Sequence, residues 1–167
     1  PARAEARRSE FDLPDAQIGT DQEALLRQLQ PDVVFDCTVP EAHTQVTVTA
    51  LEHGCHVLGE KPLADSMANA RTSLAAAAKA DRIYAVIQNR RYDPNIRRLR
   101  RLLASHAIGP LTSVDADFYL GAHFDGFRAE MDHVLLLDMA IHTFDAARLI
   151  SNADPVSVYC REWNAAG

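Results

Sequence analysis

The feature that most constrains the fold is a regular alternation of short apolar runs with helical stretches. Three of the runs predict strands: 33–37, 56–58 and 83–87. The continuous apolar run 33–37 is typical of a parallel strand buried on both faces, and 83–87 of another buried strand. Stretches with helical spacing and capping residues lie around them: 22–29, 41–53, 67–80 and 95–105. This order predicts an α/β fold with a doubly wound parallel sheet and right-handed crossovers.

The pattern changes after Gly109 and Pro110. Residues 112–120 alternate between apolar and polar side chains, as in a half-exposed strand of an antiparallel sheet. A helix at 132–150 and a last strand at 156–162 follow. We therefore expect a first domain at 1–109 and a second at 110–167. Two strands and one helix cannot cover both faces of a sheet, so the second domain is expected to be partial.

Composition excludes several classes of protein. The 167 residues are 47% hydrophobic and 24% charged, which is typical of a soluble globular chain. A net charge of −6 argues against a general nucleic-acid binder, and the arginines of 95–105 are distributed around their helix, as on a solvated face. No run of 18 apolar residues predicts a membrane span.

The cysteines indicate the compartment. Cys37, Cys55 and Cys160 are widely spaced and form no CxxC pair, so we expect reduced thiols in a cytoplasmic protein and no structural zinc site. The chain has no starting methionine, which indicates that upstream sequence is missing.

The stretch Glu60-Lys61-Pro62 follows the strand at 56–58. In open α/β sheets, ligands bind beyond the carboxyl ends of the strands, so a lysine there is a candidate for chemistry. Pro62 restricts Lys61 to extended backbone geometry. The alternative is a surface ion pair between Glu60 and Lys61, which these residues alone do not exclude.

Asp138 and His142 are four residues apart in the predicted helix 132–150 and so share one face. A carboxylate beside an imidazole suits general acid–base catalysis, although such a pair is also common on helix surfaces. A metal site that adds Asp132 and His133 is disfavoured, because residues 133 and 138 project to different sides of a helix. The chain contains no GxGxxG phosphate-binding motif.

Four ordered stretches together resemble the glucose–fructose oxidoreductase / inositol dehydrogenase (Gfo/Idh/MocA) family. They are residues 37–43, 59–64, 89–94 and 138–145. The resemblance implies a Rossmann domain that lacks its first βαβ part, followed by the start of an α/β domain with a mainly antiparallel sheet. It identifies the chain as the middle of a longer NAD(P)-dependent oxidoreductase.

The resemblance also implies roles for single residues. The catalytic set would be Lys61, Asp138 and His142. The residues near NAD or NADP would be Thr38, Pro40, His43, Glu60, Lys61 and Arg91. The implied substrate is a sugar or polyol, without a metal, nucleic acid or membrane as partner. The full-length protein is expected to form a homo-oligomer through its C-terminal sheet.

The chemistry requires one group to accept a proton while the cofactor takes a hydride. His142 suits the proton near neutral pH, and a cationic Lys61 would stabilise the developing alkoxide. The sequence leaves open which of the two accepts the proton. It also leaves open two other functions: a non-catalytic regulatory relative that binds nucleotide or sugar, and a reductase of imines or other carbonyls.

Overall fold

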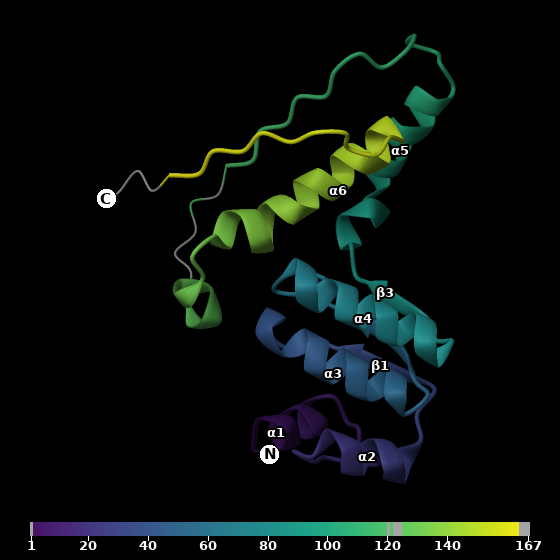
Figure 1. Cartoon of the computed structure of the whole chain (residues 1–167), viewed down its shortest axis with the longest axis vertical. Coiled ribbons are helices and arrows are strands. Elements are labelled where there is room, and N and C mark those ends of the chain that lie inside the picture. The colour runs from purple at the N-terminus through teal and green to yellow at the C-terminus, as the bar shows by residue number, and fades with distance from the viewer. Residues whose placement is uncertain (1, 120, 122–124, 164–167) are drawn as a thin grey trace. The chain divides into compact units, whose positions relative to one another are not determined.

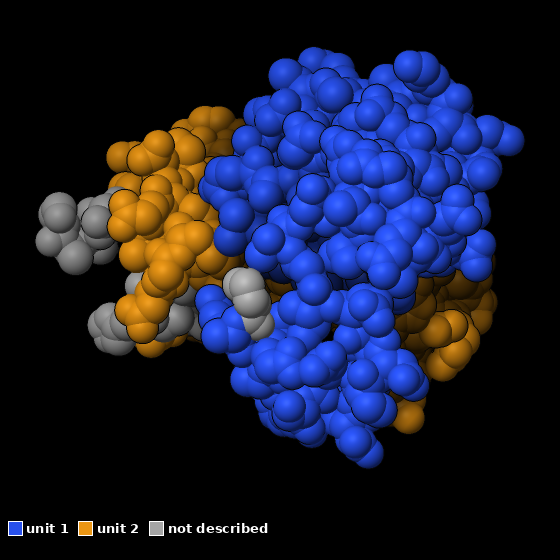
Figure 2. Space-filling view, turned by 90° about the horizontal axis from the view of Figure 1, so that it is seen from below, with its two compact units in different colours: residues 1–87 blue, residues 88–167 orange. Residues whose placement is uncertain are grey.

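The computed structural model describes residues 2–119, 121 and 125–163 (Figure 1). The chain divides into two compact units, residues 1–87 and 88–167, which Figure 2 colours separately. This division groups α5 (Pro94–Ala104) with α6 (Ala140–Ser151), and these two helices pack together. The predicted boundary near residue 109 would instead assign α5 to the first domain. The assignment of 1–109 and 110–167 as domains stays a prediction.

The first unit contains a parallel sheet in the order β1-β2-β3. The strands are β1 (Val33–Asp36), β2 (His56–Gly59) and β3 (Tyr84–Val86). Val34 pairs with Val57, which in turn pairs with Tyr84. The predicted parallel α/β arrangement is therefore confirmed for this unit, and the ends of all three strands meet at one edge.

Four helices complete the unit: α1 (Ala2–Glu10), α2 (Gln22–Leu29), α3 (Pro40–Glu52) and α4 (Met67–Ala80). The capping predictions hold. The Asp21 carboxylate accepts from Ala24 N at 3.0 Å, and the Ser66 hydroxyl accepts from Asn69 N at 3.2 Å. Gly54 follows α3 with φ +81°, a left-handed conformation that glycine adopts without a side-chain clash.

The core lies between the sheet and the helices α3 and α4, which lie side by side in Figure 1. Val57 is its central strand residue, packed with Leu51 and Ala50 of α3 and Ala77 of α4. The buried Cys55 adds a small apolar side chain.

The opposite face of the sheet differs from the prediction. Val33 and Phe35 are 44% and 66% exposed, whereas Asp36 at the end of the same strand is 1% exposed. The expectation that 33–37 is buried on both faces is wrong for the described residues. Alternate residues of a strand point to opposite faces, and α3 and α4 pack against only one of them.

The regular secondary structure described in the second unit is helical. After the 3₁₀ turn η1 (Asn89–Tyr92) and α5 come a second 3₁₀ turn, η2 (Gly126–Glu130), the π-helical turn η3 (Leu135–Met139) and α6. The predicted helix 132–150 begins later than expected, because its residues 132 and 133 form a turn. None of the described helices is long and apolar enough to cross a bilayer.

The two strands predicted for this unit are not formed in its described part. Residues 112–119 and 156–162 form no regular secondary structure, and Leu120 lies outside the described residues. A strand exists through hydrogen bonds to a neighbouring strand, and the described segments of this unit offer none. The alternation of apolar and polar residues at 112–120 predicts a strand, but it does not identify the segment that would pair with that strand.

Candidate functional site

Asp36 is the centre of a buried polar cluster at the carboxyl edge of the sheet. Its Oδ1 accepts from the Thr38 hydroxyl at 2.6 Å and from Thr38 N at 3.1 Å. Its Oδ2 accepts from the Thr47 hydroxyl of α3 at 3.2 Å and lies 3.1 Å from Nδ1 of His43. With 1% exposure, this carboxylate has several polar partners in place of water.

Two of the predicted residues, Thr38 and His43, belong to this cluster, and Pro40 lies between them in the sequence. Pro40 begins α3, where a missing N–H costs nothing, and His43 lies one turn further on. His43 is 1% exposed, with Nδ1 3.4 Å from the Thr38 hydroxyl, so its ring is turned into the unit. Its Nε2 has no hydrogen-bond partner among the described residues.

Asp36 itself was not singled out from the sequence. The available signal was a carboxylate inside the apolar run 33–37, because a buried charge needs partners. The contact of Thr38, Pro40 and His43 with a cofactor stays a prediction.

Glu60 and Lys61 lie where β2 ends, as predicted. The N–H of Glu60 donates to the Asp36 carbonyl at 2.8 Å, and the N–H of Ile87 donates to the Gly59 carbonyl at 2.8 Å. These bonds hold the start of the turn between β1 and β3. The Lys61 N–H donates to Glu60 Oε2 at 3.3 Å, and the Lys61–Pro62 peptide is cis. Lys61 is partly buried at this edge.

Asp138 and His142 are both buried, at 1% and 8% exposure, which excludes the alternative of a surface pair. Asp138 belongs to the π-helical turn η3, where the N–H of Ala140 donates to the Leu135 carbonyl five residues back. Such turns occur frequently at functional sites.

Arg128 is a partner of Asp138 that sequence reasoning missed. Its Nε donates to Asp138 Oδ2 at 2.7 Å, and a terminal nitrogen lies 3.4 Å from Oδ1. The guanidinium also covers the ring of Phe127, 4.6 Å from its centroid. Arg128 lies in η2, ten residues before Asp138, and no helical spacing connects the two positions in the sequence.

His142 and Thr143 line a pocket of about 470 Å³ in the second unit. Apolar side chains of α5, α6 and the segment 112–119 form most of its wall, among them Ile96, Val114 and Phe118. The Arg90 guanidinium lies 5.0 Å from the Phe118 ring centroid at the same pocket. An apolar pocket with a few polar groups is the usual form of a small-molecule site.

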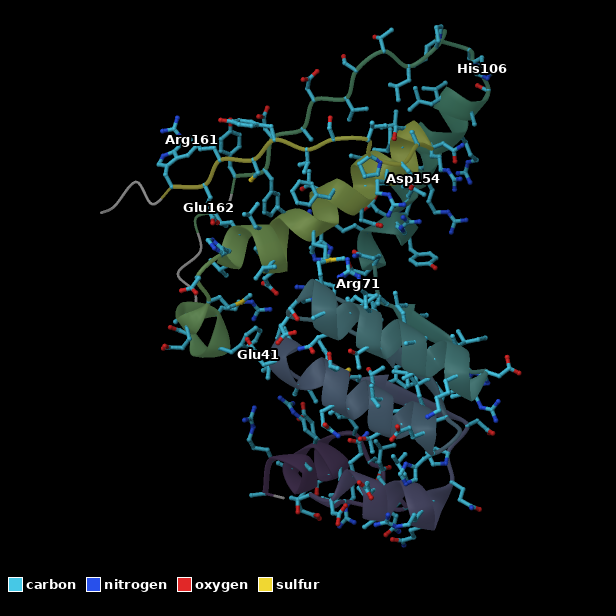
Figure 3. All side chains as sticks on the ribbon, in the orientation of Figure 1. Glu41, Arg71, His106, Asp154, Arg161 and Glu162 are labelled. Carbon is cyan, nitrogen blue, oxygen red and sulfur yellow. The ribbon has the colours of Figure 1, made fainter. Side chains whose placement is uncertain are left out.

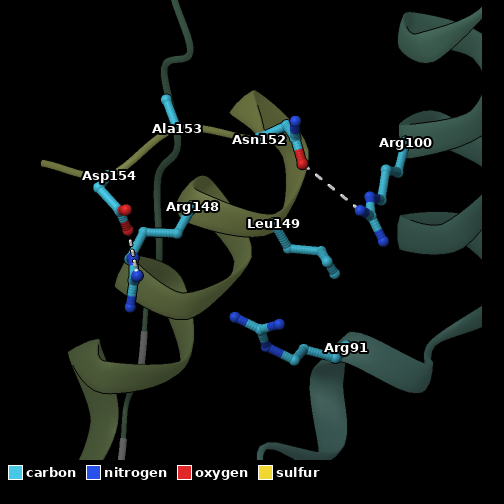
Figure 4. A pocket seen from close by; sticks show the side chains of 7 residues that line it. All are labelled: Arg91, Arg100, Arg148, Leu149, Asn152, Ala153 and Asp154. Atoms are coloured by element: carbon cyan, nitrogen blue, oxygen red, sulfur yellow. Dashed lines mark hydrogen bonds and ion pairs between the residues drawn. The ribbon is translucent and has the colours of Figure 1, made fainter.

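Arg91 pairs with Asp145 of α6. Its Nε lies 2.8 and 2.7 Å from the two carboxylate oxygens, and this hydrogen bonding raises the pKa of the guanidinium above its usual range. Arg91 also lines a second pocket of about 260 Å³ (Figure 4). There Arg148 pairs with Asp154, and Arg100 donates to the Asn152 side-chain oxygen at 3.5 Å. These arginines therefore pair with acidic and polar side chains of α6 and of the residues that follow it.

Charged side chains elsewhere are spread over the surface, such as Glu41 on α3 and Arg71 on α4 (Figure 3). In the part of the chain that the structure describes, no three His, Cys, Asp or Glu side chains gather as they would around a metal ion. The four residues that were considered as an alternative metal site, Asp132, His133, Asp138 and His142, therefore form no such group.

Two family models match the chain. Residues 1–88 match the model described as an oxidoreductase family with an NAD-binding Rossmann fold, and residues 96–166 match a GFO/IDH/MocA C-terminal domain.

Individual relatives agree with the family models. The chain is 33% identical to 1,5-anhydro-D-fructose reductase of Ensifer adhaerens over 81% of its length, and 28% identical to myo-inositol 2-dehydrogenase of Thermotoga maritima over 83%. It spans 42% of each of these proteins. The aldose-aldose oxidoreductase of Caulobacter crescentus shares the fold, with a TM-score of 0.75 at 22% identity over 93% of this chain and 48% of that one.

Proposed function

Because this chain belongs to the Gfo/Idh/MocA family of oxidoreductases, we propose that the protein transfers a hydride between NAD or NADP and a sugar, polyol or related small hydroxy compound. One observation supports this most. The buried pair Asp138 and His142 lies on a π-helical turn and the helix after it, and His142 lines a pocket of suitable size.

The carboxyl edge of the sheet suits a dinucleotide. Parallel strands bind ligands beyond this edge, and the loops after β1 and β2 both begin there. Thr38, Pro40 and Glu60 would hold the cofactor on this edge, and Arg91 would add a guanidinium. When bound, NAD or NADP supplies the hydride acceptor.

The side chains of this protein would handle the proton. His142 accepts it from the substrate hydroxyl, since a neutral imidazole is an effective base near neutral pH. Lys61, as a cation, stabilises the alkoxide that develops on the same oxygen. Arg128 holds Asp138, which orients His142 or the substrate. His43 would act indirectly, by fixing the loop of Thr38 from within the unit.

The proposal also covers the antiparallel sheet and the homo-oligomer of the full-length protein. In the full-length protein, residues 112–120 and 156–162 become strands of a mainly antiparallel sheet once their partner strands are present. That sheet would also provide the contact between subunits of a cytoplasmic homo-oligomer. Nucleic acids and membranes have no part in this function.

The test uses the full-length protein with NAD or NADP and a panel of aldoses and polyols, followed by absorbance of the reduced cofactor. Lys61→Ala and His142→Ala should each lose turnover by roughly 10²–10⁴-fold while cofactor binding is kept. Lys79→Ala, which removes an exposed lysine of α4, is the matched control and should keep turnover. Cofactor binding without turnover on any substrate would favour the regulatory alternative.

A further inference from the structure

Tyr84, the first residue of β3, packs against the end of β2. A methyl group on Gly59 would lie 3.3 Å from Cε2 of the Tyr84 ring and 3.5 Å from its hydroxyl oxygen. The ring therefore occupies the space into which a side chain at residue 59 would project. The hydroxyl donates a hydrogen bond of 2.9 Å to the carbonyl of Leu63.

This contact fixes the far end of the turn that carries Lys61. The near end is fixed by the 2.8 Å hydrogen bond from Glu60 N to the Asp36 carbonyl. Between these two points only a short length of backbone, with Lys61 and Pro62, is left to move. The Tyr84 hydroxyl thus binds the backbone two residues after Lys61.

We propose that Tyr84 is a positioning residue for Lys61, acting through its hydroxyl bond to Leu63 and its packing on Gly59. The role of Lys61 in hydride transfer rests on the proposed function, but its positioning by Tyr84 does not. The two can therefore be tested separately.

The chain contains two lysines, Lys61 and Lys79, which makes amine labelling a direct test. The purified protein is treated with trace acetic anhydride between pH 7 and 10, and acetylation of each lysine is measured by mass spectrometry. In Tyr84→Phe the labelling rate of Lys61 should change about two- to tenfold, which corresponds to the loss of one hydrogen bond. The rate of Lys79, on the outer side of α4, should stay unchanged.

Two further variants sharpen the test. Gly59→Ala pushes the ring away and should alter Lys61 labelling as Tyr84→Phe does. Tyr159→Phe removes the hydroxyl of a tyrosine that is 89% exposed and should alter neither lysine. An unchanged Lys61 in Tyr84→Phe would overturn the proposal. So would an equal change at both lysines, because that indicates general loosening.

Activity gives a second readout. Tyr84→Phe should lower kcat for the proposed reaction several-fold with little change in KM, because the cationic lysine is displaced from the transition state. If the wild-type protein has no turnover, the proposed function fails and the labelling result still decides the role of Tyr84.

Discussion

The buried carboxylate of Asp36 binds several polar side chains in the interior of the first unit. It lies in the otherwise apolar strand β1, and Thr38, Thr47 and His43 surround it. A buried carboxylate that lost these partners would carry a large desolvation cost, so the cluster and the strand depend on each other. The sequence places Thr38 and His43 beside the strand, but only the fold of α3 brings Thr47 to the same carboxylate.

Removing that carboxylate should therefore be costly. Asp36→Ala leaves the Thr47 hydroxyl and the His43 ring without their acceptor, and should lower the free energy of unfolding by about 2–4 kcal/mol. Urea denaturation followed by circular dichroism measures this. Asp15→Ala, at an exposed position of the connector before α2, should change stability by less than about 0.5 kcal/mol. Equal effects of the two variants would contradict the account of the cluster.

Tyr84 predicts how stability depends on alkaline pH. Its pKa in the folded state is raised above the ordinary value near 10, mainly by burial. As the pH rises through 10, the unfolded chain releases this proton first, so the contribution to stability is complete below about pH 10 and is lost above it. Denaturation between pH 8 and 11 should show a shallower decline for Tyr84→Phe than for the wild type. Parallel curves would contradict the burial of the phenol.

At the scale of elements, the sheet is covered on one face. Val57 projects toward α3 and α4, whereas Phe35 projects from the opposite face and is 66% exposed. Both are apolar residues in apolar runs, and the sequence predicted burial on both faces for the run that contains Phe35. Hydrophobic periodicity predicts a strand, but it does not predict whether helices cover one face of the sheet or both.

This difference is measurable in a matched pair of variants. Val57→Ala should destabilise the chain by about 2 kcal/mol, because it leaves a cavity among Leu51, Ala77 and their neighbours. Phe35→Ala in the same chain should cost less than about 1 kcal/mol, because most of that ring already contacts water. Urea midpoints of the two variants give the comparison. A larger loss in Phe35→Ala would show that its face of the sheet is covered.

The elements that local sequence determines were predicted within a few residues, and α2 and α4 agree in both bounds. Their ends depend on neighbouring capping residues such as Asp21 and Ser66, which a sequence displays directly. The π-helical turn at Asp138 and the bond from Arg128 were not predictable, because both arise from packing between segments. The strands predicted at 112–120 and 156–162 are not formed in the described residues, because strand pairing likewise depends on other segments.

At the scale of the whole molecule, the proposed catalytic residues come from both units. Lys61 belongs to the first, and Asp138 and His142 belong to the second. The family match covers both units, while the chain spans less than half of the relatives it resembles. We propose that Lys61 and His142 serve one reaction, so their effects on the rate should depend on each other.

The sharpest test is to measure turnover of the full-length double variant Lys61→Ala/His142→Ala and to compare it with each single variant. Each single variant should lose roughly 10²–10⁴-fold in kcat/KM. Because the rate effects of residues that act as a unit are strongly non-additive, the double variant should lose little more than the more severe single variant. Losses that multiply in the double variant, or full turnover in either single variant, would contradict the account.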